Sequence, residues 1–275
     1  MRRSAHALSR HESAPVEAES LSIERPKGGY GRRVVDAIFA HRRLARIYDA
    51  FDGDRDDLPV YLDIVDKLGA DRVLDVGCGT GCLALMLAAA GRTVVAVDPA
   101  EASLDVAKAK GAAARITWIH GDAAALPQLD ADLAVMTGNV AQVFLSDDDW
   151  AQALHAIRAA LGLNGYFVFE TRRPERRAWE EWAADAGAVV LDVPGSGQVE
   201  RHLEVTDVRL PLVSFRYTYR FLADDAVVTS DSTLRFRSRD EMESSLIAHG
   251  YRVLDVRDAP DRPGREFVFI AQRTT

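Results

Sequence analysis

Residues 73–81 read Val-Leu-Asp-Val-Gly-Cys-Gly-Thr-Gly, and this stretch decides the fold. Its first four residues, apolar except for one acid, are typical of a short parallel strand that is buried on both faces. Three glycines follow at alternate positions, and an apolar run over 82–90 then ends at Gly91. The predicted order is therefore strand, glycine-rich turn and helix. Glycine lets the chain turn tightly and lets backbone amides approach a ligand with no side chain in the way.

The spacing of these glycines distinguishes two kinds of nucleotide-binding turn. A dinucleotide fold uses G-x-G-x-x-G to hold a pyrophosphate at a helix N-terminus. Here the pattern is D-x-G-x-G-x-G, which is one residue tighter and places Asp75 before the first glycine. We interpret this turn as suited to a cofactor with a nucleoside and a cationic, amine-bearing tail.

The chain around and after the turn alternates apolar strands with helices. Strands are expected at 72–76, 93–97, 115–119, 133–137 and 166–170, with helices at 82–90, 101–110 and 147–161. This alternation favours a parallel sheet with helices on both faces, which binds ligands beyond the carboxyl ends of its strands. Asp98 stands at the end of the second strand, where it could accept hydrogen bonds from both ribose hydroxyls. Capping of the next helix is the alternative role for Asp98.

The glycine turn, Asp98 and Gly121-Asp122-Ala123 after the third strand occur in order. With this order and rough spacing, the chain resembles the class I S-adenosylmethionine (SAM) dependent methyltransferases of the small-molecule type over about residues 72–171. The resemblance implies SAM as the cofactor and S-adenosylhomocysteine as the product. It also implies cofactor contacts by Gly77, Cys78 and Gly79 through the backbone, by Asp75 at the α-amino group, by Pro99, Asp122 and Ala123 around adenine, and by Thr137 at the amino-acid part.

The acceptor site is predicted after the fourth and fifth strands and on the region that follows them, at Asn139, Glu170, Arg172, Trp179 and Tyr219. An acid, guanidinium groups and aromatic rings suit a small polar, charged or partly aromatic acceptor. Helix capping and packing of the tryptophans are the alternative. The expected reaction is in-line displacement at the methyl carbon, catalysed mainly by proximity and alignment. No catalytic base is identified, because the candidates lie in no recognisable base motif: His120, His155, His202 and His249.

The expected fold class is α/β, a doubly wound, seven-stranded, mostly parallel sheet with N-terminal helices and an inserted antiparallel β meander. Period-two alternation over 188–237 indicates the meander. One helix is expected over 32–51 and another over 58–68. The expected domains are a flexible tail at 1–31, cap helices at 32–69, the SAM-binding core at 70–184, the inserted β region at 185–238 and the C-terminal part of the core at 239–275.

Composition narrows the class of protein. The chain of 275 residues has a net charge of −8 and a pI of about 5.4, which argues against a large basic nucleic-acid-binding face. Its two cysteines, Cys78 and Cys82, make neither a disulfide framework nor a zinc site. No apolar run approaches the length of about 20 residues that a membrane helix needs. We expect a cytoplasmic protein with a small-molecule partner, without metal, membrane or nucleic acid, and of undetermined oligomeric state.

Two other functions stay open at this stage. The same fold could bind NAD(P) as an oxidoreductase, although such an enzyme has no reason to keep Asp122. A non-catalytic module could bind SAM with all three motifs intact. A methyltransferase acting on RNA or protein is disfavoured, since no basic groove or aromatic RNA-binding motif appears.

Overall fold

The computed structural model describes residues 35–111, 115–123, 126–185 and 187–275, and the predicted tail at 1–31 lies outside them. The described residues form one compact unit. Its elements in chain order are α1 (Ala37–Ala40), α2 (Arg42–Asp52), α3 (Leu58–Leu68), β1 (Arg72–Val76), α4 (Cys82–Ala89), β2 (Thr93–Asp98), α5 (Glu101–Ala109), β3 (Ile116–His120), β4 (Ala131–Met136), η2 (Val140–Val143), α6 (Asp147–Ala160), β5 (Leu161–Arg172), η3 (Pro174–Arg176), α7 (Ala178–Ala184), β6 (Val189–Val193), β7 (Gly197–Arg209), β8 (Leu212–Phe221), β9 (Ala226–Arg235), α8 (Arg239–Ala248), β10 (Tyr251–Asp258) and β11 (Glu266–Arg273).

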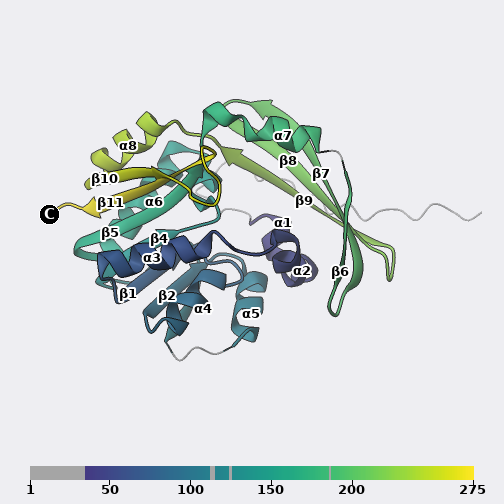
Figure 1. Ribbon diagram of the computed structural model, residues 1–275, viewed down its shortest axis with the longest axis horizontal. Helices are drawn as coiled ribbons and strands as arrows, with labels where there is room; N and C mark the ends of the chain where they lie inside the picture. The colour runs from purple at the N-terminus through teal and green to yellow at the C-terminus, as the bar shows by residue number, and fades with distance from the viewer. Residues whose placement is uncertain (1–34, 112–114, 124–125, 186) are drawn as a thin grey trace, which may run out of the picture. The chain divides into compact units, whose positions relative to one another are not determined.

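Seven strands form the main sheet in the order β10-β11-β5-β4-β1-β2-β3. The pairs β5–β4, β4–β1, β1–β2 and β2–β3 are parallel, while β11 runs antiparallel to both β5 and β10. Strand order reverses between β1 and β4, so the carboxyl ends of these two strands mark the ligand-binding edge of such a sheet. The α/β fold class, the seven strands and the mostly parallel arrangement are confirmed (Figure 1).

Two apolar layers cover the main sheet. On one face, α3 and α4 pack through a cluster that includes Ile64, Leu87 and Val168. On the other face, α6 and α8 pack through a cluster that includes Trp150, Leu246 and Phe169. Neighbouring residues of β5 therefore face different layers, as the strand periodicity requires. None of the helices in the described ranges is long and apolar enough to cross a membrane.

The predicted meander is confirmed as a second, antiparallel sheet in the order β6-β7-β8-β9, inserted between β5 and α8. Figure 1 shows these long strands passing beside the N-terminal helices. Ile38, Leu44 and Ile47 of those helices pack with Val199 and Phe221 of the second sheet. The Ile38 amide also donates a hydrogen bond to Ser230 Oγ on β9 at 2.8 Å.

The prediction of a single helix over 32–51 was wrong, because His41 takes an extended conformation and separates α1 from α2. In a continuous helix, Ile38 and Leu44 would point about 120° apart. The break lets both side chains reach the same apolar cluster. Packing against the second sheet therefore overrides the local helical pattern.

The start of the fifth strand also differs from the prediction. Residues 161–165 already belong to β5, and Asn164-Gly165 does not form a turn before it. Asn164 has a φ of 61°, and the pairing of β4 with β5 shifts register across this segment. The left-handed Asn164 therefore lies within β5, where it accompanies an irregularity in the strand pairing.

Candidate active site

The glycine turn connects β1 to α4 and is held against the end of β2. The amides of Gly77 and Cys78 donate to the Val97 carbonyl at 2.8 and 3.1 Å. A Cβ atom at Gly77 would lie 2.7 Å from Val140, and one at Gly81 would lie 2.6 Å from Trp118. At Gly79, by contrast, no described heavy atom would lie within 4 Å of an added Cβ. Packing therefore explains the outer two glycines, while the middle one borders open space.

Asp98 closes the turn from the end of β2. Its Oδ2 accepts from the Gly79 amide at 2.8 Å, and its Oδ1 accepts from the Ala100 amide at 2.8 Å. The side chain is buried, and this burial raises the pKa of Asp98. The bond from the Ala100 amide is not a helix cap, because Ala100 is itself the N-cap of α5, and α5 has no side-chain cap hydrogen bond. Each carboxylate oxygen keeps a second lone pair for a ligand hydroxyl.

Asp75 lies beneath the same turn and is only 1% exposed. Its Oδ2 has no hydrogen-bond partner among the described residues. Burial, aided by the negative charge of Asp98, raises the pKa of Asp75 to about 7. A buried carboxyl with an unused oxygen suits a ligand that brings a cationic donor.

The adenine-side residues of the prediction lie at the same edge of the sheet. Asp98 pairs in register with His120, and the Gly121 amide donates to the Asp98 carbonyl at 3.0 Å. This places the exposed Asp122 and the buried Ala123 beside the end of β2. Pro99 is exposed, and its carbonyl lies 3.1 Å from His120 Nε2.

The segment after β4 meets the end of β5 through Glu170. The amides of Gly138 and Asn139 donate to Glu170 Oε1 at 2.6 and 3.2 Å. The Tyr61 hydroxyl of α3 donates to Oε2 of the same carboxylate. Burial and the neighbouring Glu266 raise the pKa of Glu170. Asn139 holds a left-handed conformation at φ 60°, which is uncommon for a residue other than glycine. The predicted residues Asn139 and Glu170 are thus in direct contact, and Thr137 is the first residue after β4.

Three residues that the sequence reasoning missed complete this group: Gln142, Arg262 and Glu266. Glu266 Oε1 accepts from Asn139 Nδ2 at 2.9 Å and from Arg262 Nη1 at 3.1 Å. The predicted Arg172 lies 4.0 Å from the same oxygen and donates to Gln142 Oε1 at 2.9 Å. The available signal was an acid at the start of the apolar strand 266–271, which pairs antiparallel with the fifth strand.

Trp179 and Tyr219 are not brought into this group. Trp179 packs edge-on against Phe236 at 4.8 Å between ring centroids and is buried with Val213. Tyr219 packs edge-on against Phe51 at 5.5 Å, and burial raises its pKa to about 12. Both rings thus have aromatic packing partners, Trp179 next to the second sheet and Tyr219 on its strand β8. Trp182, by contrast, contacts the predicted site residue Arg172, whose guanidinium lies 5.3 Å from the centre of the Trp182 ring.

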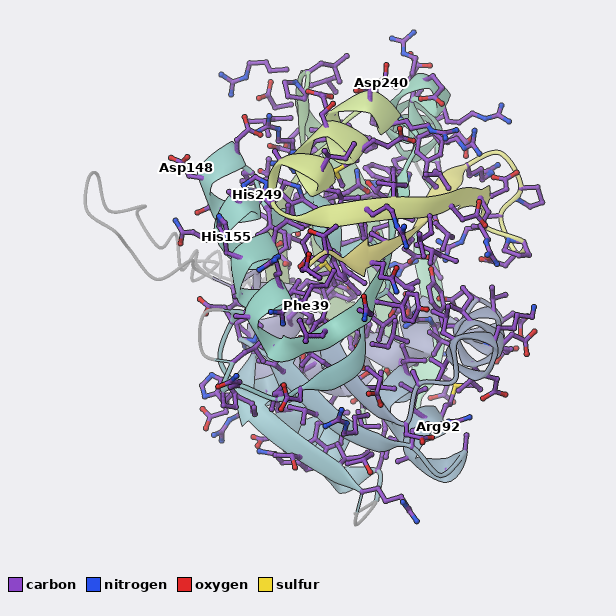
Figure 2. The ribbon with its side chains drawn as sticks, turned by 90° about the vertical axis from the view of Figure 1, so that its left-hand side faces the viewer. Phe39, Arg92, Asp148, His155, Asp240 and His249 are labelled. Carbon is purple, nitrogen blue, oxygen red and sulfur yellow. The ribbon has the colours of Figure 1, made fainter. Side chains whose placement is uncertain are left out.

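Two of the candidate bases lie elsewhere on the molecule. His155 of α6 and His249 after α8 contact each other with ring centroids 4.9 Å apart (Figure 2). His249 precedes β10, whose first residue pairs with the end of β11 and so lies at the amino-terminal edge of the parallel strands. This histidine pair is therefore at the opposite edge of the sheet from the glycine turn.

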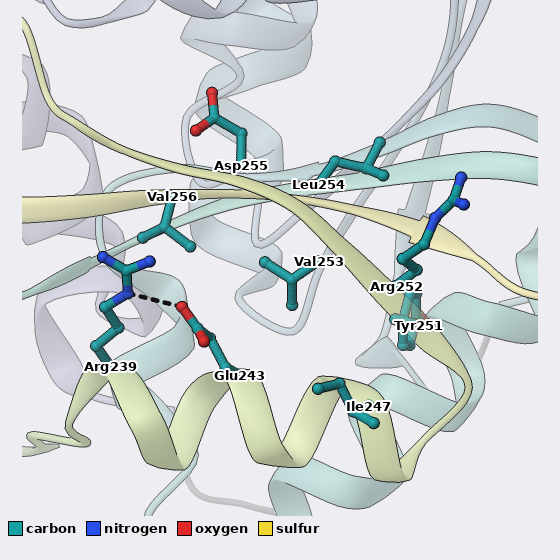
Figure 3. A pocket seen from close by; sticks show the side chains of 9 residues that line it. All are labelled: Arg239, Glu243, Ile247, Tyr251, Arg252, Val253, Leu254, Asp255 and Val256. Carbon is teal, nitrogen blue, oxygen red and sulfur yellow. Dashed lines mark hydrogen bonds and ion pairs between the residues drawn. The ribbon is translucent and has the colours of Figure 1, made fainter.

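A groove of about 630 Å³ runs between α8 and the edge strand β10. Figure 3 shows Arg239 paired with Glu243 at one end, and aliphatic side chains such as Ile247 and Val253 along the rest. The groove contains none of the predicted site residues. We therefore place the candidate site at the glycine turn and the Glu170 group.

Comparisons with known proteins concern the family and the fold. Residues 73–165 match the family described as a methyltransferase domain. An uncharacterized methyltransferase of Oceanobacillus iheyensis is 33% identical over 99 residues, which cover 36% of this chain and 46% of that protein. The chain thus spans less than half the length of this curated relative.

Solved structures share the fold over most of the chain. A SAM-dependent methyltransferase from Clostridium acetobutylicum superposes with a TM-score of 0.67 at 17% identity, covering 86% of this chain and 99% of that one. The sugar N-methyltransferase KedS8 from Streptoalloteichus gives a TM-score of 0.70 at 18% identity, covering 92% and 100%. At these identities the likeness concerns the fold.

Proposed function

Because this chain belongs to the class I SAM-dependent methyltransferases, we propose that it transfers a methyl group from SAM to a small-molecule acceptor. The observation that carries the proposal is the unpartnered Asp75 carboxylate oxygen beneath a turn whose middle glycine borders open space. The ammonium group of such a cofactor would donate a hydrogen bond to Asp75, and the rest of the cofactor would fill the space beside Gly79. When bound, SAM supplies the methyl group on a sulfonium together with its own leaving group.

In this proposal, each element at the carboxyl edge has one task. The turn amides and Asp75 bind the amino-acid part of the cofactor, aided by Thr137. Asp98 accepts from the ribose hydroxyls with its remaining lone pairs, and Pro99, Asp122 and Ala123 surround adenine. The protein mainly aligns the acceptor with the methyl carbon, and such alignment contributes roughly 7–11 kcal/mol in favourable cases.

The division of labour along the chain is part of the same proposal. Residues 70–184 form the SAM-binding core and 239–275 its C-terminal part, which together also carry the group around Glu170, while 32–69 and 185–238 cover the acceptor. The Glu170 group supports a small acceptor, because its polar atoms are buried between three strands and a helix instead of spread over an exposed surface. The sugar N-methylation named for KedS8 is a property of that protein, at an identity that shows only the shared fold.

Isothermal titration with SAM and S-adenosylhomocysteine tests the proposal, and we expect micromolar binding. Gly79→Ala should weaken S-adenosylhomocysteine binding at least tenfold, because its Cβ enters the space that the ligand needs. Gly91→Ala is the matched control, since Gly91 also has a positive φ and no described heavy atom within 4 Å of an added Cβ. Gly91 follows the C-cap of α4 at the other edge of the sheet, and Gly91→Ala should leave binding unchanged.

Three outcomes would count against the proposal. If neither SAM nor S-adenosylhomocysteine bound, the proposed function would be wrong. NADH fluorescence enhancement on mixing would favour the oxidoreductase. Tight SAM binding without S-adenosylhomocysteine formation across a broad acceptor panel would favour a non-catalytic binding module.

A further inference from the structure

Two buried acids and an arginine lie on one face of the sheet where β5 and β11 meet. Glu266 pairs in register with Arg172, and Glu170 lies two residues before Arg172 on β5. Residues paired in an antiparallel ladder, and residues two apart on a strand, share a face. Glu170, Arg172 and Glu266 therefore all face the layer that contains α3 and Tyr61. Thr171 points to the other face.

Some of the buried acceptor atoms around Glu170 and Glu266 have hydrogen-bond donors, and others have none. Glu170 accepts from Tyr61, Gly138 and Asn139. Glu266 Oε1 accepts from Asn139 and Arg262. Glu266 Oε2 and Asn139 Oδ1 have no partner in the described part of the chain. Glu266 and Asn139 are only 1% and 2% exposed, so bulk water does not replace the missing bonds.

Both unsatisfied atoms are acceptors, which fixes the chemistry of the missing partner. They belong to two side chains already joined by a hydrogen bond of 2.9 Å, so one donor group could serve both. The nearest cations are engaged elsewhere: Arg262 also binds Asp261, and Arg172 binds Gln142. A carboxylate or phosphate would meet Glu266 with like charge. An ammonium group brings up to three N–H donors and the complementary charge.

The position of these acceptors ties them to the cofactor turn. Asn139 follows β4, the strand beside β1, whose end carries the turn. The next residue, Val140, packs so closely over Gly77 that an added Cβ there would lie 2.7 Å from it. A ligand group bound by Asn139 would therefore lie next to Val140, the residue that packs against the glycine turn at Gly77.

We propose that Glu266 and Asn139, backed by Glu170, bind an amino group of the acceptor, so that the acceptor class is a small amine. This inference rests on the proposed methyltransferase function and concerns recognition of the acceptor. Arg262 and Arg172 hold the Oε1 side of Glu266 in place and leave Oε2 for the ligand.

The test measures binding by ligand-observed NMR in the presence of saturating S-adenosylhomocysteine. The probes are amine and alcohol pairs on one carbon skeleton: cyclohexylamine and cyclohexanol, benzylamine and benzyl alcohol, glucosamine and glucose. We expect at least one amine to bind ten times more tightly than its alcohol. Glu266→Gln should remove that preference. Glu243→Gln, which alters a paired glutamate in the groove of α8, should keep it.

Failure of this inference is distinguishable from failure of the proposed function. S-adenosylhomocysteine binding by the wild-type protein tests the function alone. If that binding holds while amines and alcohols bind equally, or while no amine binds, the inference is overturned. Asn139→Ala gives a second test should Glu266→Gln not fold, and unchanged amine preference in a folded Asn139→Ala variant would equally overturn it.

Discussion

Asp75 shows how one residue can couple cofactor binding to pH. The carboxyl is buried beside Asp98, and its pKa is raised to about 7. In the free protein it therefore carries a proton below that pH. The ammonium group of the proposed ligand favours the ionised form. Binding below pH 7 must then expel a proton, and binding above pH 7 need not.

We therefore expect the affinity for S-adenosylhomocysteine to rise about tenfold between pH 6 and pH 8, since binding at pH 6 must also ionise a group of pKa about 7. Titration calorimetry at both pH values measures the change. Asp75→Asn cannot ionise and should bind weakly with little pH dependence. Equal wild-type dissociation constants at the two pH values would contradict the assigned role of Asp75.

At the scale of elements, a hydrogen bond and an ion pair connect α2 to the glycine turn and to the end of α5. Asp49 Oδ1 accepts from the Thr80 hydroxyl at 2.5 Å, and Asp49 Oδ2 pairs with Lys110 Nζ at 2.6 Å. Lys110 also donates to the Thr80 carbonyl at 2.8 Å, so one side chain joins the end of α5 to both. An N-terminal helix and the proposed cofactor turn are thus held in one polar cluster.

Asp49→Ala should lower the free energy of local opening of α2 by about 1 kcal/mol. This is the usual contribution of one hydrogen bond plus a partly exposed ion pair. We expect amide hydrogen exchange in α2 to quicken about fivefold while exchange in α6 stays unchanged. Asp54→Ala makes the same change of charge at an exposed position two residues after α2 and serves as the control. Equal effects of the two variants would show that Asp49 does not fasten the helix.

At the scale of the molecule, Arg235 and Arg237 connect the second sheet to the core through hydrogen bonds and an ion pair. Arg237 is 3% exposed and donates to the carbonyls of Phe144 and Ser146, each at 2.9 Å. Arg235 donates to the Leu145 carbonyl at 3.1 Å and pairs with Asp147 at 2.8 Å. Burial lowers the pKa of Arg237 to about 10, so it remains charged at neutral pH. These bonds join the end of β9 to the segment that begins α6.

Replacing Arg237 with Met keeps the apolar stem but removes the buried guanidinium and its hydrogen bonds to the Phe144 and Ser146 carbonyls. We expect the free energy of unfolding to fall by about 2–4 kcal/mol in urea titrations. The exposed Arg239→Met should change it by less than about 0.5 kcal/mol. If both sheets form one cooperative unit, Arg237→Met will unfold in a single transition. A separate early transition for the second sheet would show that the arginines do not couple it to the core.

The sequence by itself determined the order of strands and helices, the glycine turn and the acids at the strand ends, because these depend on local periodicity and on the geometry of parallel strands. It could also place Asn139 and Glu170 at one edge of the sheet, since Asn139 comes just after one predicted parallel strand and Glu170 ends another. Only the tertiary structure decided the break at His41, because packing on the second sheet outweighs local helix preference. It also showed that Trp179 and Tyr219 pack against Phe236 and Phe51, which the sequence could not reveal because an aromatic side chain looks the same whether it packs or binds a ligand.

The tertiary structure alone brought Glu266 and Arg262 to Asn139, more than a hundred residues away in the chain. That contact comes from the antiparallel register of β11 on β5, which no local pattern encodes. The unpaired oxygens of Glu266 and Asn139 follow from the same register, and so the chemistry of the proposed acceptor could be inferred only once the strands were in place.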